Sequence, residues 1–161
     1  MNDDRIERIR IFKIECRDYL FNIARAEQLE LSLKALMVRM ENVHSPALEK
    51  IGQSPSRKEL DRIAQIMTKT KMEEELELIH RRTGWVDSVI EAISSPAYQY
   101  TIKMTYINGH TINEFAVLYD VSIDHMYKVR RQFLERALTD EKMAELDEII
   151  AKLEELELRK S

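Results

Sequence analysis

Residues 106–138 read YINGHTINEFAVLYDVSIDHMYKVRRQFLERAL, and the spacing in this stretch decides the fold. It predicts two short helices joined by a tight turn. Thr111 can cap the first helix through its hydroxyl, and Glu114, three residues later, would complete a capping box. Asp120 occupies the turn, where a left-handed residue is usual, and Asp tolerates that conformation better than most residues do. Ser122 then caps the second helix.

The apolar residues of this stretch fall on one side of each helix. Phe115 and Tyr119 are one turn apart and would face a core, while Ala116 is small enough for a second helix to cross close by. Val121 is expected to fill the core beneath the turn. The second helix would bury a stripe made of Met126, Val129 and Phe133. This is the spacing of a DNA-binding helix-turn-helix, whose second helix enters the major groove through its first turns.

The outward face of the second helix and the caps of both helices supply the candidate DNA-contacting residues. They are Thr111, Ser122, Ile123, Asp124, His125, Tyr127, Lys128, Arg130 and Arg131. Asp124 also suits the first turn of a helix, because a carboxylate there interacts favourably with the macrodipole. The alternative is two packed helices with a solvated basic face, since any amphipathic helical hairpin imitates part of this pattern.

The composition favours an all-α protein. The chain has 161 residues with only three Gly and three Pro, which argues against a sandwich, a barrel or a disordered chain. The length suits one domain, or a small domain with a long helical extension. No run is apolar enough to span a bilayer, and the N-terminus lacks the apolar region of a signal peptide. The single Cys16 excludes an internal disulfide framework, so we expect a cytoplasmic protein.

The formal net charge of −4 argues mildly against a nucleic-acid partner. The distribution matters more than the sum, because positive residues gather at Lys128, Arg130, Arg131 and Arg136 while negative ones follow between Asp140 and Glu157. A local positive patch can still bind phosphates, with modest and salt-sensitive affinity. Dimerisation would double the patch.

Residues 1–94 predict a long-helix hairpin or coiled coil that serves oligomerisation or contact with a partner. Two heptad rows run through its first half. One contains Ile9, Cys16, Ile23 and Met37 and is interrupted by Glu30, which could fix the register of the pairing; the other contains Phe12, Tyr19, Ala26, Leu33 and Met40. Residues 44–55 are interpreted as a connector, in which 47–51 could form a helical turn.

The second long helix is expected to begin at Ser56, with Glu59 completing a capping box. Gly84 could mark a kink or a break within it, since Gly costs roughly 1 kcal/mol relative to Ala in a helix. Trp85 is expected to pack against the first long helix, because its neighbours follow an apolar stripe.

Residues 95–138 would form a three-helix domain that contains the helix-turn-helix. Ser95 as cap and Pro96 at the first helical position would start its first helix, and Gly109 would end it in a left-handed conformation. Residues 139–161 predict a final amphipathic helix with a short coiled-coil row of Leu146, Ile149, Leu153 and Leu156. Such a helix is marginal alone, so it should pack on the first helices or on a second subunit.

Catalytic and metal-binding patterns are weak. The four histidines show no ligand spacing, and Cys16 on an apolar row suggests a buried, inert thiol. One Glu-x-x-His occurs at Glu77 to His80, but a di-metal helical site needs a second copy, so we interpret it as chance. We therefore expect no enzyme activity, no metal and no cofactor.

The stretch 106–138 resembles the C-terminal helix-turn-helix of sigma-70-like proteins, sigma-70 region 4, which reads promoter DNA. It is most similar to the version in small phage and prophage regulators of the ArpU and RinA type. In those proteins a long N-terminal helical region precedes a C-terminal segment of this kind. The matching positions are Tyr106, Ile107, Gly109, Thr111, Glu114, Ala116, Ser122, Met126 and Tyr127, within about a fifth of the chain.

This resemblance implies a transcription regulator, often of phage late genes. It implies that Ile123, Asp124, His125, Lys128 and Arg131 face bases or nearby phosphates and that Thr111 contacts the DNA backbone. The sequence departs from the pattern at Asp120, where glycine is favoured, and at Ile123 and His125, where arginine is frequent. The acidic helix after Leu138 is a further departure, because a minimal sigma-70-like C-terminus does not require it.

The resulting hypothesis is a cytoplasmic regulator of phage or prophage genes that binds double-stranded DNA as a homodimer or higher homo-oligomer, with host RNA polymerase as a further partner. One alternative is a small-terminase-like DNA-packaging protein, although those usually place the DNA-binding part first. The other is a helical protein-interaction module without DNA binding, which the acidic net charge supports.

Overall fold

The computed structural model describes residues 2–42 and 56–160, and within these ranges it is all-α, without a strand. The expected connector at 44–55, with its helical turn at 47–51, lies outside the described residues. The elements are α1 (Asn2–Asn42), α2 (Arg57–Glu91), α3 (Pro96–Ile102), the π-helical turn η1 (Lys103–Ile107), α4 (Ile112–Tyr119), α5 (Ile123–Ala137) and α6 (Asp140–Lys160).

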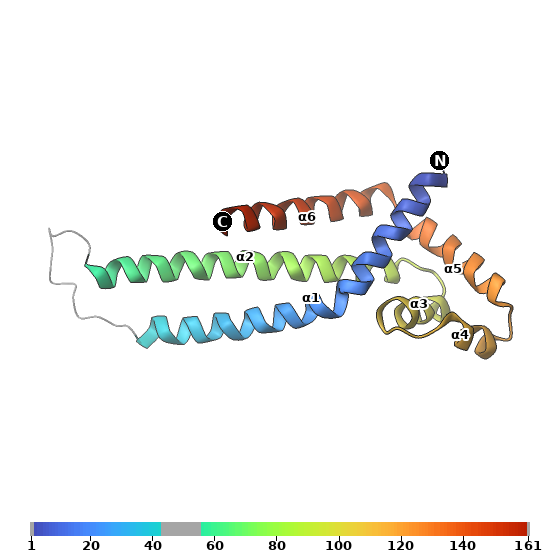
Figure 1. The fold of residues 1–161 in the computed structure, drawn as a ribbon, viewed down its shortest axis with the longest axis horizontal. Helices are drawn as coiled ribbons and strands as arrows, with labels where there is room; N and C mark the ends of the chain where they lie inside the picture. The colour runs from blue at the N-terminus through green and yellow to red at the C-terminus, as the bar shows by residue number, and fades with distance from the viewer. Residues whose placement is uncertain (1, 43–55, 161) are drawn as a thin grey trace.

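The long helices α1 and α2 lie side by side, and α6 lies on the other side of α2 (Figure 1). The N-terminal part of α1 bends across the C-terminal end of α2 and crosses α5, while α3 and α4 sit at the same end of the molecule. Residues at seven-residue steps along α2 contact α6: Glu74 pairs with Arg159, Arg81 pairs with Glu148, and Ser88 accepts a hydrogen bond from Lys142. The final helix therefore packs on the first helices, as the apolar row in 139–161 predicts.

Local signals set the helix boundaries. Ser56 and Glu59 form the expected capping box, with both hydrogen bonds at 3.2 Å. Ser95 caps α3 by accepting from the Tyr98 N–H, and Pro96 follows at the first helical position, as expected. Gly84 neither kinks nor breaks the chain into two helices, because α2 runs unbroken through it.

One hydrophobic cluster joins the long helices to the helix-turn-helix end. It contains Phe12 of α1, Trp85 of α2, Leu134 of α5 and Leu146 of α6, all almost fully buried. The Trp85 ring lies 6.1 Å from the Phe12 ring, which confirms its expected packing on the first helix. Its indole Nε1 donates a 2.6 Å hydrogen bond to the Lys142 carbonyl oxygen. Fully buried Trp side chains need such an acceptor, so Trp85 fixes α2 against both α1 and α6.

Two polar contacts join α1 to α2. Glu15 is only 3% exposed and accepts two hydrogen bonds from Arg82, at 2.8 and 2.7 Å. Glu30, which interrupts the apolar row, lies 3.1 Å from the His80 ring nitrogen Nε2. The buried Glu15–Arg82 pair favours one alignment of the two helices, whereas Glu30 and His80 are about half exposed and contribute little to the register that Glu30 could have fixed.

Candidate nucleic-acid interface

The turn between α4 and α5 is the one that the sequence predicts. Asp120 has φ 54° and ψ 48°, so it is left-handed. The Val121 N–H donates to the Ala116 carbonyl at 3.0 Å and the Asp120 N–H donates to the Val117 carbonyl at 3.2 Å. These two bonds satisfy the last carbonyls of α4 in the manner of a Schellman motif. The Ser122 hydroxyl then accepts a 3.1 Å hydrogen bond from the His125 N–H and starts α5.

Two expected details of the helix-turn-helix are wrong. Thr111 is the N-cap of α4, but its hydroxyl makes no capping bond, and the carboxylate of Glu114 contacts the His110 ring at 3.0 Å, so the expected capping box is absent. Val121 does not fill the core beneath the turn, since it is 36% exposed. The small core there is made of Ile112, Phe115, Ala116 and the fully buried Met126.

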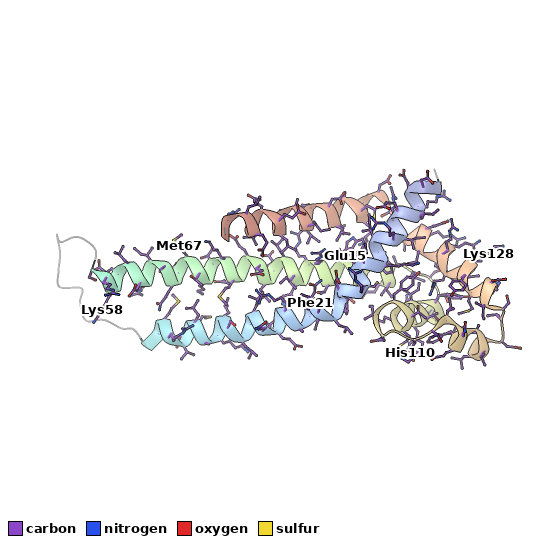
Figure 2. The ribbon with its side chains drawn as sticks, in the orientation of Figure 1. Glu15, Phe21, Lys58, Met67, His110 and Lys128 are labelled. Carbon is purple, nitrogen blue, oxygen red and sulfur yellow. The ribbon has the colours of Figure 1, made fainter. Side chains whose placement is uncertain are left out.

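The first turns of α5 present a continuous exposed face. Of the predicted contact residues, those exposed on or beside α5 are Ser122, Ile123, Asp124, His125, Tyr127, Lys128 and Arg131. Lys128 points away from the rest of the molecule in Figure 2. Arg131 is half exposed and donates through Nε to Glu135 at 3.0 Å. Thr111 is also exposed, at the start of α4.

Arg130 does not share this face, so its expected outward orientation is wrong. Only 8% of it is exposed. Its guanidinium carbon lies 4.6 Å from the centre of the Tyr106 ring and 5.2 Å from that of Tyr127, and Nη1 donates to Thr105 Oγ1 at 3.2 Å. The reason is helical spacing: the buried stripe of α5 steps by three or four residues through Met126, Arg130, Leu134 and Ala137, which leaves Val129 and Phe133 only half-buried.

The π-helical turn η1 brings Tyr106 to Arg130. The Asn108 N–H reaches back five residues to the Lys103 carbonyl at 3.2 Å, and Gly109 ends the helix with φ 74°, as expected. Tyr106 then lies between the Phe12 ring, 5.9 Å away, and the Arg130 guanidinium. Burial raises the pKa of the Tyr106 hydroxyl, and the nearby Arg130 cation opposes that rise. The sequence predicts a helix here but gives no signal of the π-helical turn.

A basic pocket of about 460 Å³ lies between the start of α1 and α5. We call it the α1–α5 pocket, and its lining residues are Ile6, Ile9, Arg10, Lys13, Tyr106, Tyr127, Arg130 and Arg131. Arg10 and Lys13 were missed from the sequence, because a helix-turn-helix pattern does not extend to α1. The available signal was their spacing of three residues, which places two cations on one helix face.

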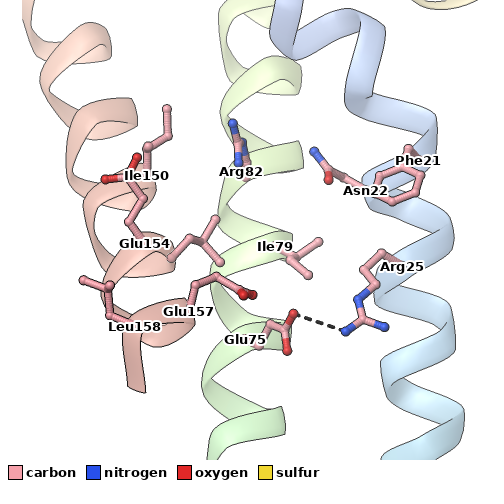
Figure 3. A pocket seen from close by; sticks show the side chains of 11 residues that line it. Phe21, Asn22, Arg25, Glu75, Ile79, Arg82, Ile150, Glu154, Glu157 and Leu158 are labelled. Carbon is pink, nitrogen blue, oxygen red and sulfur yellow. Dashed lines mark hydrogen bonds and ion pairs between the residues drawn. The ribbon is translucent and has the colours of Figure 1, made fainter. Parts of the chain in front are cut away.

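A second hollow, of about 760 Å³, opens between α1, α2 and α6 (Figure 3). The largely exposed side chains of Phe21 and Leu158 lie at its edges, and Arg25 pairs with Glu75 inside it at 3.4 Å. It is lined by residues of both charges, unlike the α1–α5 pocket, whose charged lining residues are all cations.

Two other kinds of feature are absent from the described part of the chain. In residues 2–42 and 56–160, no three His, Cys, Asp or Glu side chains are grouped so that they could hold a metal ion. Among the helices described, none has the length and apolar character that crossing a membrane requires.

Comparison with known proteins adds no relative to this geometry. No protein-family model matches the chain, and neither a curated protein nor a solved structure does. The function is therefore argued from the site itself.

Proposed function

We propose that the protein is a DNA-binding transcription regulator of phage or prophage genes, resembling the ArpU and RinA type, which reads DNA with α5. The observation that carries this proposal is the exposed face at the start of α5. A left-handed turn and a serine cap hold this face in place, and the buried stripe of α5 faces the opposite way.

The dimensions and chemistry of this face suit a major groove. An α-helix with its side chains is about 10–12 Å wide, and the major groove of B-DNA is about 12 Å wide. Lys128 and Arg131 would bind phosphates or guanine edges, while Asp124 would accept from a cytosine amino group. Because the Thr111 hydroxyl is not used as a cap, it can donate to a backbone phosphate beside the groove.

We further propose that a second copy of the chain covers the start of α2. Leu60 and Met67 continue the seven-residue series of α2 residues that face α6, but α6 ends beside Glu74. Leu60, Ile63 and Met67 are all more than half exposed as a result, and Met67 points to the side of α2 on which α6 lies (Figure 2). Two such rows packed antiparallel would bury each other and would place two α5 helices in one assembly.

The test removes the two outward cations of α5. Changing Lys128 and Arg131 together to Ala should weaken binding to duplex DNA and lower the salt slope of log K by roughly two, at about 0.9 for each phosphate that the protein no longer neutralises. Changing Lys152 and Arg159 to Ala is the matched control, because it removes the same charge from exposed positions on α6. Circular dichroism checks that both variants stay helical. Equal affinities of the two variants for duplex DNA would contradict the proposal that α5 reads DNA.

A specific observation favours the second candidate, a protein-interaction module without DNA binding. The outer face of α4 exposes Val117 by 82% and Leu118 by 67%, and apolar residues this open are typical of protein-binding surfaces. This candidate predicts that the wild-type protein shifts no duplex, even at low salt where binding to phosphates is strongest.

A further inference from the structure

The α1–α5 pocket gathers four cations and no carboxylate. Arg10 and Lys13 come from α1 and Arg130 and Arg131 come from α5, and none of the residues that line the pocket is acidic. These positions are more than a hundred residues apart in the chain and meet only because the start of α1 crosses α5. Converging cations in a concave surface concentrate an anion more strongly than the same cations spread over a flat one.

Two of these cations have carboxylate partners and two do not. Arg10 pairs with the exposed Glu7, and Arg131 pairs with Glu135, which is 21% exposed; pairs in contact with solvent are weak, so an anion can compete with them. Lys13 and Arg130 have no carboxylate within ion-pair distance among the residues that the structure describes. Both instead lie over the Tyr106 ring, with Lys13 Nζ at 5.6 Å and the Arg130 guanidinium carbon at 4.6 Å from its centre.

Arg130 is the most informative of the four. It is 8% exposed, and its only side-chain hydrogen bond to a described residue runs from Nη1 to Thr105. Across the described residues no sealed side-chain nitrogen or oxygen lacks a partner. The Nε and Nη2 atoms of Arg130 are therefore not sealed from solvent, and since Arg130 lines the pocket they can donate to an anion there. The Arg130 guanidinium lies over the rings of both Tyr106 and Tyr127 and bonds to Thr105, so it is already ordered and little conformational entropy is lost when it binds an anion.

We propose that the α1–α5 pocket binds a phosphate group, and that in the DNA complex this group is a backbone phosphate flanking the groove that α5 enters. The assignment of this group to DNA rests on the proposed function. Tyr127 and Arg131 belong both to the pocket and to the exposed face of α5, so the two surfaces are continuous. Arg130 donates in a fixed fork, and Lys13 and Arg10 neutralise the charge from the opposite wall.

The site gives the first turns of α1 a role beyond packing. It adds phosphate contacts from outside the helix-turn-helix and thereby offsets the net negative charge of the chain. Arg130, although buried, then belongs to the binding surface through its open edge and not through the outer face of α5.

The experiment compares Arg10→Gln with Lys13→Gln in one variant against Lys34→Gln with Arg39→Gln in another. All four residues are exposed cations on α1, so the two variants lose the same charge, but only the first pair lines the pocket. The probes are a labelled random-sequence DNA duplex, followed by anisotropy over a potassium chloride series, and pyrophosphate, followed by phosphorus NMR. Thermal melts check that both variants fold.

We expect the pocket variant to lower the salt slope of log K by about 0.9, the value for one phosphate, while the control keeps the wild-type slope. We also expect pyrophosphate to bind the wild type and the control but not the pocket variant. Equal slopes and equal pyrophosphate binding in all three proteins would overturn the proposal.

The two proposals can fail separately. If the wild type binds pyrophosphate through the pocket but binds no duplex, the phosphate site stands with a free phosphate compound as its ligand, and the DNA-binding function falls. If the duplex binds through Lys128 and Arg131 but the pocket variant behaves as the control does, the function stands and the pocket is excluded.

Discussion

Breaking the pair between Glu15 and Arg82 should have a cost that depends on which partner is removed. Both hydrogen bonds of the pair are short. The hydrogen bond to Glu15 stabilises the charged guanidinium and so raises the pKa of Arg82. The two side chains differ in burial, however, with 3% of Glu15 and 25% of Arg82 exposed to solvent.

The expected magnitudes follow from that difference. Arg82→Met leaves a buried carboxylate without its cation, and removing one partner of a buried pair costs about 3–5 kcal/mol. Glu15→Gln leaves a guanidinium that can reach water along its own stem, and the amide oxygen still accepts one hydrogen bond, so we expect a loss of about 1 kcal/mol.

Urea unfolding followed by far-ultraviolet circular dichroism measures both free energies of unfolding. Arg17→Met is the control, because Arg17 lies on α1 with 73% of its side chain exposed, and its replacement should change stability by no more than experimental error. Equal losses for Arg82→Met and Glu15→Gln, or a larger loss for the latter, would refute the argument from burial.

Three further predictions concern single sites. Cys16 is fully buried and burial raises its thiol pKa, so it should react with a thiol reagent only when the protein unfolds. The measurement compares the rate of labelling in native protein with the rate in urea. Asp120→Gly should raise the free energy of unfolding by about 0.5–1 kcal/mol in urea titrations, because glycine adopts the left-handed turn without strain. Burial and the hydrogen bond to Asp87 raise the pKa of Tyr19 from 10.0 to about 12, so the unfolded chain loses this proton first. Stability should fall as pH rises across that interval, and Tyr19→Phe should remove this part of the fall in alkaline melts.

Signals contained in a few neighbouring residues predicted the structure well. The serine caps at 56, 95 and 122, the proline at 96 and the left-handed Asp120 and Gly109 act through their own backbone and its nearest turn. Such effects need no knowledge of the rest of the fold, and these were confirmed, whereas the equally local capping box of Thr111 and Glu114 was wrong.

Features that depend on tertiary contacts were missed or misplaced. Arg130 was expected on the outward face because Val129 and Phe133 were predicted to form the buried stripe, but it lies over the rings of Tyr106 and Tyr127 and bonds to the Thr105 hydroxyl. Thr105 and Tyr106 belong to the π-helical turn η1, which the sequence does not predict. Arg10 and Lys13 were missed for the same reason, since only the crossing of α1 over α5 brings them to the candidate interface.

The common core of the molecule has a practical consequence for engineering. Leu134 and Leu138 pack with Phe12, Val89 and Leu146, so a fragment cut out at residues 95–138 would expose those leucines to water. Helix α5 therefore cannot be transplanted alone, and a chimaera built to test the proposed DNA binding must exchange the outward side chains of α5 while keeping every surrounding helix in place.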